Sequence, residues 1–194
     1  MYLKIKRLID LLISIILLVI LFPLNIIIGI ILIAIGIGNP IYKQTRTGKD
    51  GKDFTIYKFT TMKEKNVIPK FCMFLRKTGL DETLQLINII KGEMSLIGPR
   101  PWIIDYKKHF TKKQKRRLEV LPGLTGLAQT RNTENVLEKI EYDIYYVDNI
   151  SFKMDLYVFF SSFTWIFFGK KNEYSTSDIQ GELELLKKNK RGIK

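Results

Sequence analysis

The chain has 194 residues, and its 32 lysine and arginine residues outnumber its 19 aspartate and glutamate residues, giving a formal net charge of +13. The one cysteine, Cys72, excludes an internal disulfide and a cysteine-based metal site. The one histidine, His109, excludes most histidine-based triads and polyhistidine metal sites, so acid–base or nucleophilic chemistry would use carboxylates. The charge predicts an anionic partner: lipid head groups, phosphorylated substrates or nucleic acid.

The first long segment, residues 11–42, contains no charged side chain, and Pro23 lies near the middle of its apolar part. As a straight helix the segment would be ~48 Å long, whereas the hydrocarbon core of a bilayer needs about 20 residues, or ~30 Å. Proline removes a backbone donor, so we expect a kink or break that leaves two short apolar helices at residues 11–22 and 24–37.

Basic residues flank this segment on both sides, and positive charge favours the cytoplasmic face. One interpretation is a re-entrant helix that enters the membrane, turns at Pro23 and leaves on the same face. The alternative is a tilted spanning anchor with an external domain, since proline is tolerated in spanning helices. A cleaved signal peptide is not expected, because the apolar run is too long and lacks a small-residue cleavage site.

A β-hairpin is predicted next. Residues 41–44 and 54–59 are β-prone, and the basic segment 45–52 between them is rich in turn residues.

The strongest helix signal covers residues 80–90, where leucine and isoleucine recur at helical spacing. Thr78 lies three residues before Asp81 and predicts a capping box, and Gly92 is expected to end the helix. Beyond it, residues 97–101 contain two prolines and a glycine and predict a stiff, irregular turn.

Residues 111–121 predict another helix, stopped by Pro122. Its neighbourhood is strongly basic, which indicates either a solvated helix face or a surface that docks to anionic lipid. The basic residues are Lys107, Lys108, Lys112, Lys113, Lys115, Arg116 and Arg117.

Residues 156–169 form an uncharged, aromatic segment that is too short to span a bilayer, which favours an interfacial helix over a buried core helix. Residues 170–194 are polar and charged and predict a loosely ordered tail.

Two adjacent carboxylates, Asp81 and Glu82, begin the strongest soluble helix. Acids in a first turn can serve only to cap the helix. Here Lys58, Arg76 and Arg100 are candidates to surround them, so the pair could instead bind a divalent metal beside a phosphate, or act as a nucleophile that takes a phosphoryl group.

Several short motifs occur in a specific order along residues 1–169. They are Lys6-Arg-Leu-Ile-Asp10, the proline of the apolar run, Ile56-Tyr-Lys-Phe59 with Thr61-Met62, Leu80-Asp-Glu-Thr-Leu-Gln-Leu86, Lys91-Gly-Glu-Met-Ser95, Gly98-Pro-Arg-Pro101, Pro122-Gly-Leu-Thr-Gly126 with Ala128-Gln129, and Asp143-Ile-Tyr-Tyr-Val147. Each motif alone is weak. Together, in this order, they resemble the bacterial sugar transferases, specifically the small monotopic phosphoglycosyl transferases.

The resemblance implies an enzyme that transfers a phosphosugar from a UDP-sugar to undecaprenyl phosphate and releases UMP, which is the initiating step of bacterial surface glycan synthesis. It implies that Asp81 is the nucleophile that forms a covalent phosphosugar intermediate, and that Glu82 assists it at a Mg²⁺ site formed by the two carboxylates. The residues that it implies for substrate binding are Lys58, Arg76, Arg100, Gln129 and Arg131.

The implied fold is mainly α with a small β-hairpin, in a monotopic membrane protein. Residues 1–40 form the kinked re-entrant helix, residues 41–169 a catalytic domain with interfacial amphipathic helices, and residues 170–194 a charged tail. The implied location is the bacterial cytoplasmic membrane, with the catalytic domain on its cytoplasmic face.

The sequence departs from the family pattern at the kink and in one loop. Phe22 replaces the serine that often precedes the proline, and Asn25 is expected to bond to the carbonyls freed there. The loop after Gln129 is shortened, so Arg131 matches the family's arginine across a gap.

Other functions remain open at this point. The chief alternative is a non-catalytic membrane-surface adaptor that binds anionic lipid. A homo-oligomer is possible, and a nucleic-acid partner is not expected because no binding module is recognised.

Overall fold

The computed structural model describes residues 2–63, 67–131, 133, 135–168 and 179–192. The chain forms two compact units. Unit 1 comprises residues 3–44 and 55–94, and unit 2 comprises Tyr2, residues 45–54 and the chain from Ser95 onward. The secondary structure is mainly helical with short strands, which confirms the predicted class.

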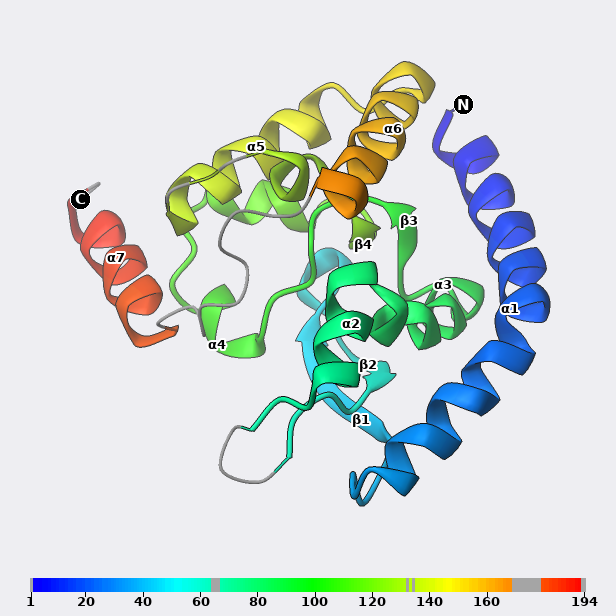
Figure 1. The fold of residues 1–194 in the computed structure, drawn as a ribbon. Helices are drawn as coiled ribbons and strands as arrows, with labels where there is room; N and C mark the ends of the chain where they lie inside the picture. Colours follow the sequence, from blue (N-terminus) through cyan, green and yellow to red (C-terminus); the bar gives the residue numbers. More distant parts are fainter. Residues whose placement is uncertain (1, 64–66, 132, 134, 169–178, 193–194) are drawn as a thin grey trace. The chain divides into compact units, whose positions relative to one another are not determined.

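Helix α1 (Tyr2–Ala34) is long and apolar enough to cross a membrane by length and composition. It is continuous through Pro23, so the prediction of two separate apolar helices is wrong. The helix instead changes direction along its length (Figure 1). A proline removes one hydrogen bond and crowds the preceding turn, which bends a helix that is otherwise well supported.

The C-terminal half of α1 packs on the core of unit 1. Ile28 and Leu32, one helical turn apart on one face, join Phe59, Cys72 and Leu75 in a buried cluster. Cys72 is fully buried, and this burial raises the pKa of its thiol. Cys72 therefore packs as a small buried hydrophobe.

The predicted hairpin is present, with strands longer than expected. It consists of β1 (Ile41–Thr47), the turn η1 (Lys49–Gly51) and β2 (Asp53–Phe59). Asn88 is fully buried and secures β2, because its Nδ2 donates to the Thr55 carbonyl at 2.7 Å and its Oδ1 accepts from Tyr57 N at 3.3 Å.

The segment predicted as one α-helix over residues 80–90 has a more complex structure. It consists of the 3₁₀ segment η3 (Leu80–Gln85) followed by α3 (Leu86–Lys91), and Gly92 ends it in a left-handed conformation, as predicted.

The helix before it, α2 (Lys70–Thr78), ends at Gly79, which is also left-handed. Thr78 is therefore the last residue of α2, and its hydroxyl donates back to the carbonyls of Phe74 and Leu75. The predicted capping box is wrong.

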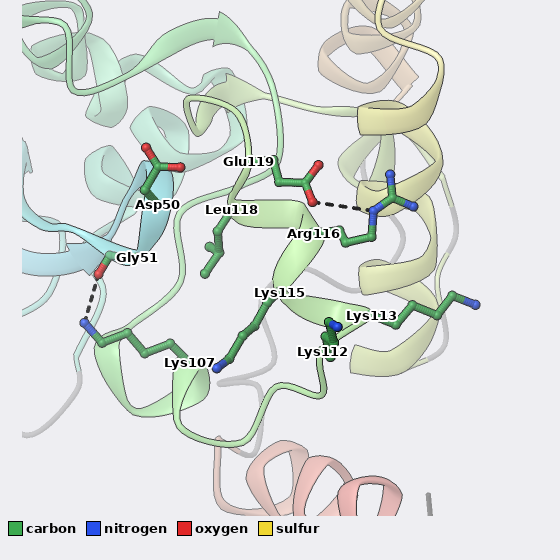
Figure 2. A pocket seen from close by; sticks show the side chains of 9 residues that line it. All are labelled: Asp50, Gly51, Lys107, Lys112, Lys113, Lys115, Arg116, Leu118 and Glu119. Atoms are coloured by element: carbon green, nitrogen blue, oxygen red, sulfur yellow. Dashed lines mark hydrogen bonds and ion pairs between the residues drawn. The ribbon is translucent and has the colours of Figure 1, made fainter.

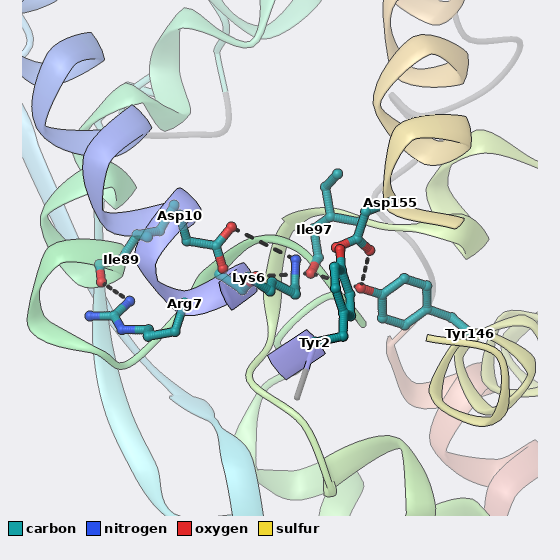
Figure 3. A network of polar contacts seen from close by, with 9 residues as sticks. Tyr2, Lys6, Arg7, Asp10, Ile89, Ile97, Tyr146 and Asp155 are labelled. Carbon is teal, nitrogen blue, oxygen red and sulfur yellow. Dashed lines mark hydrogen bonds and ion pairs between the residues drawn. The ribbon is translucent and has the colours of Figure 1, made fainter. Parts of the chain in front are cut away.

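The N-terminal motif of α1 has a structural role in unit 1. Arg7 donates to the carbonyl oxygens of Ile89 and Ile90 at 2.7 and 3.1 Å, and Lys6 and Asp10 form a buried pair one turn apart (Figure 3). These carbonyls lie at the C-terminal end of α3, where regular helical donors run out, although Gly92 N also donates to the Ile89 carbonyl at 3.0 Å. Arg7 thereby ties α3 to α1.

Unit 2 contains a feature that the sequence did not predict, a parallel pair of short strands. Strands β3 (Ser95–Ile97) and β4 (Gly123–Thr125) pair with Ser95 opposite Gly123. The chain between them includes α4 (Ile104–Lys107) and η4 (Gln114–Leu118). Element η4 is a five-residue 3₁₀ segment, so the longer helix predicted for residues 111–121 is wrong.

The remaining elements of unit 2 are helical: η5 (Leu127–Thr130), α5 (Val136–Asp148), α6 (Phe152–Phe168) and α7 (Ile179–Gly192). Asn135 caps α5 by accepting from the backbone N–H groups of Leu137 and Glu138. Asp155 in α6 is buried and accepts from the hydroxyls of Tyr2 and Tyr146 (Figure 3).

The prediction of a loosely ordered tail is wrong for residues 179–192, which form helix α7. Leu186 is fully buried in a cluster with residues of α4 and α5. Glu182 accepts from the Tyr106 hydroxyl and from Lys139 Nζ. The predicted tail thus contains a docked helix, while residues 170–178 and 193–194 lie outside the described residues.

Helix α6 exposes an apolar, aromatic face, as an interfacial helix would. Its opposite face packs inward through Asp155 and Val158. A fully buried core helix would not leave this face open to solvent. Its exposed members are Phe152, Leu156, Tyr157, Phe159, Phe160 and Phe163.

Candidate active site

The two predicted carboxylates lie at the start of η3, directly after the left-handed Gly79. Asp81 is buried and Glu82 is half-buried. Gly79 has a φ of 73°, a conformation that glycine adopts without strain, and it allows α2 to end and η3 to begin within one residue. This reversal places Asp81 near the end of α2, where Arg76 lies.

Neighbouring groups have opposing effects on the pKa of the Asp81 carboxyl. Burial and, to a lesser extent, the neighbouring charge of Glu82 raise the pKa of Asp81 to about 6, against the lowering effects of Lys58 and Arg76. A strongly shifted carboxyl with nearby cations is typical of a functional site. Because its pKa of about 6 lies below 7, the carboxylate is mostly ionised at neutral pH and is only weakly solvated.

Both predicted cations of unit 1 are held by neighbouring side chains. Arg76 Nε donates to Thr61 Oγ1 at 2.7 Å, and Thr61 itself is buried. Lys58, on β2, places its ammonium 5.1 Å from the ring centroid of Tyr42. The structure therefore brings Lys58, Arg76, Asp81 and Glu82 together in unit 1.

The other three predicted residues belong to unit 2. Arg100 lies in the irregular turn after β3, which the sequence predicted correctly. Arg131 lies over the rings of Tyr142 and Tyr157, with its guanidinium carbon 6.0 and 5.5 Å from their centroids. Gln129 Oε1 is buried and has no hydrogen-bond partner among the described residues.

A close approach of two backbones explains the glycine-rich motifs of unit 2. A Cβ placed on Gly123 would lie 2.1 Å from Gly98 N, and one placed on Gly126 would lie 2.1 Å from Gly98 O. No side chain fits at such distances, so the turn that carries Arg100 packs directly on the β4 segment.

Arg117 stabilises this turn by hydrogen bonding to its backbone, a role that was not predicted from the sequence. Its guanidinium donates to Asp143 at 2.7 and 3.0 Å and to the Arg100 carbonyl at 2.7 Å, and it stacks on Trp102 with 4.1 Å to the ring centroid. Both side chains of the Arg117–Asp143 ion pair are almost fully buried. Arg117 is therefore a structural residue and must be removed from the predicted lipid-docking surface.

Basic side chains line a hollow in unit 2. This basic hollow has a volume of about 910 Å³ and lies between the hairpin turn and η4 (Figure 2). Lys107 and Arg116 at its edge form ion pairs with Asp53 and Asp148. The other three lysines of the hollow are exposed, and their side chains have no hydrogen bond or ion pair among the described residues: Lys112, Lys113 and Lys115.

A metal ion would find two adjacent carboxylates at η3. Among the described residues, no group of three or more histidine, cysteine, aspartate or glutamate side chains converges. Mg²⁺ is commonly bound by one or two carboxylates together with substrate phosphates. The Asp81–Glu82 pair fits that mode, and it does not fit an all-protein metal cage.

Comparison with known proteins identifies the family. A family model described as bacterial sugar transferase matches residues 1–169, which is most of the chain. The chain belongs to the bacterial sugar transferase family. The matched region includes α1, the η3 carboxylates and α6, and it ends before α7.

Several curated sugar transferases are similar to the chain. An uncharacterized sugar transferase, EpsL of Bacillus subtilis, is 45% identical over 66% of this chain and 70% of its own length. The exopolysaccharide production protein ExoY of Sinorhizobium fredii is 34% identical over 81% of this chain and 83% of its own. The UDP-glucose:undecaprenyl-phosphate glucose-1-phosphate transferase of Klebsiella pneumoniae is 32% identical over 80% of this chain. The match covers only 38% of that relative.

Proposed function

We propose that this sugar transferase moves a phosphosugar from a UDP-sugar to undecaprenyl phosphate and releases UMP. The observation that carries the proposal is the desolvated Asp81 carboxylate, flanked by Glu82, Lys58 and Arg76 in one unit. Several relatives are named as transferases of a sugar phosphate from a UDP-sugar to undecaprenyl phosphate, which supports the proposed donor and acceptor.

The proposed reaction has two displacement steps at one phosphorus atom. A carboxylate oxygen of Asp81 attacks the sugar-linked phosphorus of the donor, and the bond from that phosphorus to the bridging oxygen breaks, so UMP leaves. An oxygen of undecaprenyl phosphate then attacks the same phosphorus. The aspartyl P–O bond breaks, which regenerates the carboxylate and releases the lipid-linked diphosphosugar.

The residues of the site have separate tasks in this scheme. The Asp81 carboxylate is the nucleophile, and its incomplete solvation increases its reactivity. Lys58 and Arg76 face negative charge that builds on the phosphoryl oxygens. Arg100, Gln129 and Arg131 are proposed to bind the nucleotide or the phosphosugar. Asp81 and Glu82 would hold Mg²⁺, which when bound supplies charge neutralisation at the diphosphate.

The test is release of UMP by detergent-solubilised protein that is given undecaprenyl phosphate, Mg²⁺ and a panel of UDP-sugars. We expect release with one or two donors, dependent on the divalent metal and absent in Asp81→Asn. Folded wild-type protein that releases no UMP from any donor would contradict the proposal. It would favour the alternative of a non-catalytic lipid-binding adaptor.

We also propose that α1 is re-entrant and that the catalytic region faces the cytoplasm. The basic residues on both sides of the apolar run and the bend of α1 support this topology. The native Cys72 is buried, so an introduced cysteine provides the signal. A cysteine that replaces Lys49 in the hairpin turn should react with an impermeant maleimide only in permeabilised cells. Labelling of intact cells would contradict the topology.

Anionic lipid is the proposed surface partner, and it would contact the free lysines of the basic hollow. Each lysine near an anionic membrane contributes about 1 kcal/mol, so replacing Lys112, Lys113 and Lys115 by glutamine should weaken binding by roughly 100-fold. Co-sedimentation with phosphatidylglycerol vesicles at low salt measures the effect. Replacing Lys4, Lys52 and Lys188 removes the same charge elsewhere and is the control. Equal losses in both triple variants would show that the hollow has no special role.

A homo-oligomer remains a prediction from the sequence. Light scattering of the protein in detergent, corrected for bound detergent, measures it directly.

A further inference from the structure

A polar contact connects the membrane helix to the turn that carries the candidate nucleophile. The Thr83 hydroxyl of η3 lies 2.8 Å from Asn25 Oδ1 of α1 and 2.9 Å from the Leu80 carbonyl oxygen. A hydroxyl has one proton to donate. If the Asn25 amide is flipped by 180°, its Nδ2 donates to Thr83 Oγ1 while Thr83 Oγ1 donates to the Leu80 carbonyl oxygen. Both contacts are then satisfied together.

Asn25 is unusual in its surroundings. It is the only side-chain amide in α1 and follows Pro23 by two residues, within the apolar run. Its position predicted a bond to carbonyls freed by the proline, but its side chain contacts Thr83 instead. Polar groups in an apolar segment are costly unless they are hydrogen-bonded, and such contacts contribute about 0.5–2 kcal/mol in membranes.

Apolar packing alone would leave the orientation of η3 weakly specified. Leu80 and Leu84 pack against the cluster that contains Ile28 and Leu32 of α1, and such contacts are not directional. A 3₁₀ segment also has poorer internal hydrogen-bond geometry than an α-helix. The directional contact from Asn25 therefore supplies orientation that the turn lacks on its own.

We propose that Asn25 and Thr83 are positioning residues that set the direction of the Asp81 carboxylate toward the reacting phosphorus. Thr83 lies two residues after Asp81 in the same 3₁₀ segment, so a rotation of one moves the other. The inference rests on the proposed function and assigns part of the catalytic geometry to the membrane helix. Misplacement of a reacting group by about 1 Å can reduce a rate by up to about 100-fold.

The test is single-turnover formation of the phosphosugar adduct, with UDP-sugar and Mg²⁺ but without lipid acceptor. The amplitude of adduct formation reports the fraction of protein that is folded and competent. Its rate constant reports how well the Asp81 carboxylate is oriented toward the phosphorus. In Thr83→Val, which keeps the side-chain size, the rate constant should fall by about tenfold or more with the amplitude unchanged. Asn25→Leu and the double variant should show the same loss, because all three lack one contact.

Two conservative variants complete the design. Thr83→Ser keeps the hydroxyl and should stay within about threefold of the wild-type rate constant. Ser14→Ala removes a buried hydroxyl of α1 whose Oγ has no hydrogen-bond partner among the described residues, and it should leave the rate unchanged.

Each outcome is decisive. Rate constants of Thr83→Val and Asn25→Leu equal to wild type, losses that add in the double variant, or a fall in amplitude alone would overturn the positioning role. If wild-type protein forms no adduct and releases no UMP, the proposed function fails and this inference fails with it. If wild-type protein reacts and Thr83→Val matches it, the inference alone fails.

Discussion

Asp81→Asn is expected to stabilise the folded protein above pH 6 while it abolishes phosphosugar transfer. Asparagine has the shape of the protonated carboxyl but neither its charge nor its nucleophilic oxygen. Burial and the charge of Glu82 raise the pKa of Asp81 to about 6 in the folded protein. The ionised carboxylate therefore opposes folding, although the proposed reaction requires it.

The direction of the pH dependence follows from this shift. The folded-state pKa of Asp81 lies above the unfolded value of about 3.9, so its favourable contribution is full below pH 4 and is lost as the pH rises to 6. The difference corresponds to roughly 3 kcal/mol at pH 7, or about 5–10 °C in Tm.

Thermal unfolding in detergent with a chelator measures the effect, because a bound cation would offset the charge. The gap in Tm between Asp81→Asn and wild type should be small at pH 4 and large at pH 7.5. Asp105→Asn removes an exposed carboxylate and is the control. A Tm gap that does not change with pH would contradict the account of Asp81 as a desolvated carboxylate.

Arg117→Met is expected to be among the most destabilising substitutions outside the candidate catalytic residues. The variant leaves the Asp143 carboxylate buried without the Arg117 guanidinium, and it removes the hydrogen bond from Arg117 to the Arg100 carbonyl. Breaking one side of a buried ion pair typically costs about 3–5 kcal/mol. Burial raises the pKa of Asp143 and Arg117 opposes that shift, so the variant should lose further stability as the pH rises.

Chemical denaturation of three variants tests this prediction. Arg116→Met removes the neighbouring, more exposed ion pair with Asp148 and should have a small effect. The double variant Arg117→Met with Asp143→Leu should recover much of the loss, since an apolar pair replaces the buried charges. A double variant that is less stable than Arg117→Met would contradict the argument.

The hairpin, the left-handed Gly92 and the turn after β3 could be predicted from the sequence. Each depends on local chemistry: alternating β-prone residues, a glycine after an apolar helical run, and prolines that cannot continue a helix. The grouping of Asp81 and Glu82 with Lys58 and Arg76 was expected from the resemblance to the family, since acids in a first turn can by themselves serve only to cap a helix.

Elements that depend on contacts distant in sequence could not be predicted. Spacing of apolar residues does not distinguish the 3₁₀ segment η3 from an α-helix, because both expose similar faces over one or two turns. The parallel pairing of β3 with β4 depends on glycines that let two backbones meet. Helix α7 appeared too polar to pack, yet Leu186 with Leu183 supplies enough apolar surface to dock it.

Some family motifs that suggested a site are structural in this chain. Arg7 caps the end of α3, Asp143 pairs with Arg117, and Tyr146 donates to Asp155 and the Ile97 carbonyl. A sequence pattern alone does not distinguish a structural role from substrate binding, because the same types of charged residue are used for both. The contact between Asn25 and Thr83 was not predicted for a related reason: neither residue type signals a long-range contact, and Asn25 was expected to bond to carbonyls near Pro23.

The intact mass of the protein, incubated with the active UDP-sugar and Mg²⁺ but without lipid acceptor, tests the central claim most directly. We expect the mass to increase by one phosphosugar, with the added group mapped to Asp81 by peptide fragmentation and removed when undecaprenyl phosphate is added. UMP release without any adduct, or an adduct that forms equally in Asp81→Asn, would contradict the assignment of Asp81 as the nucleophile.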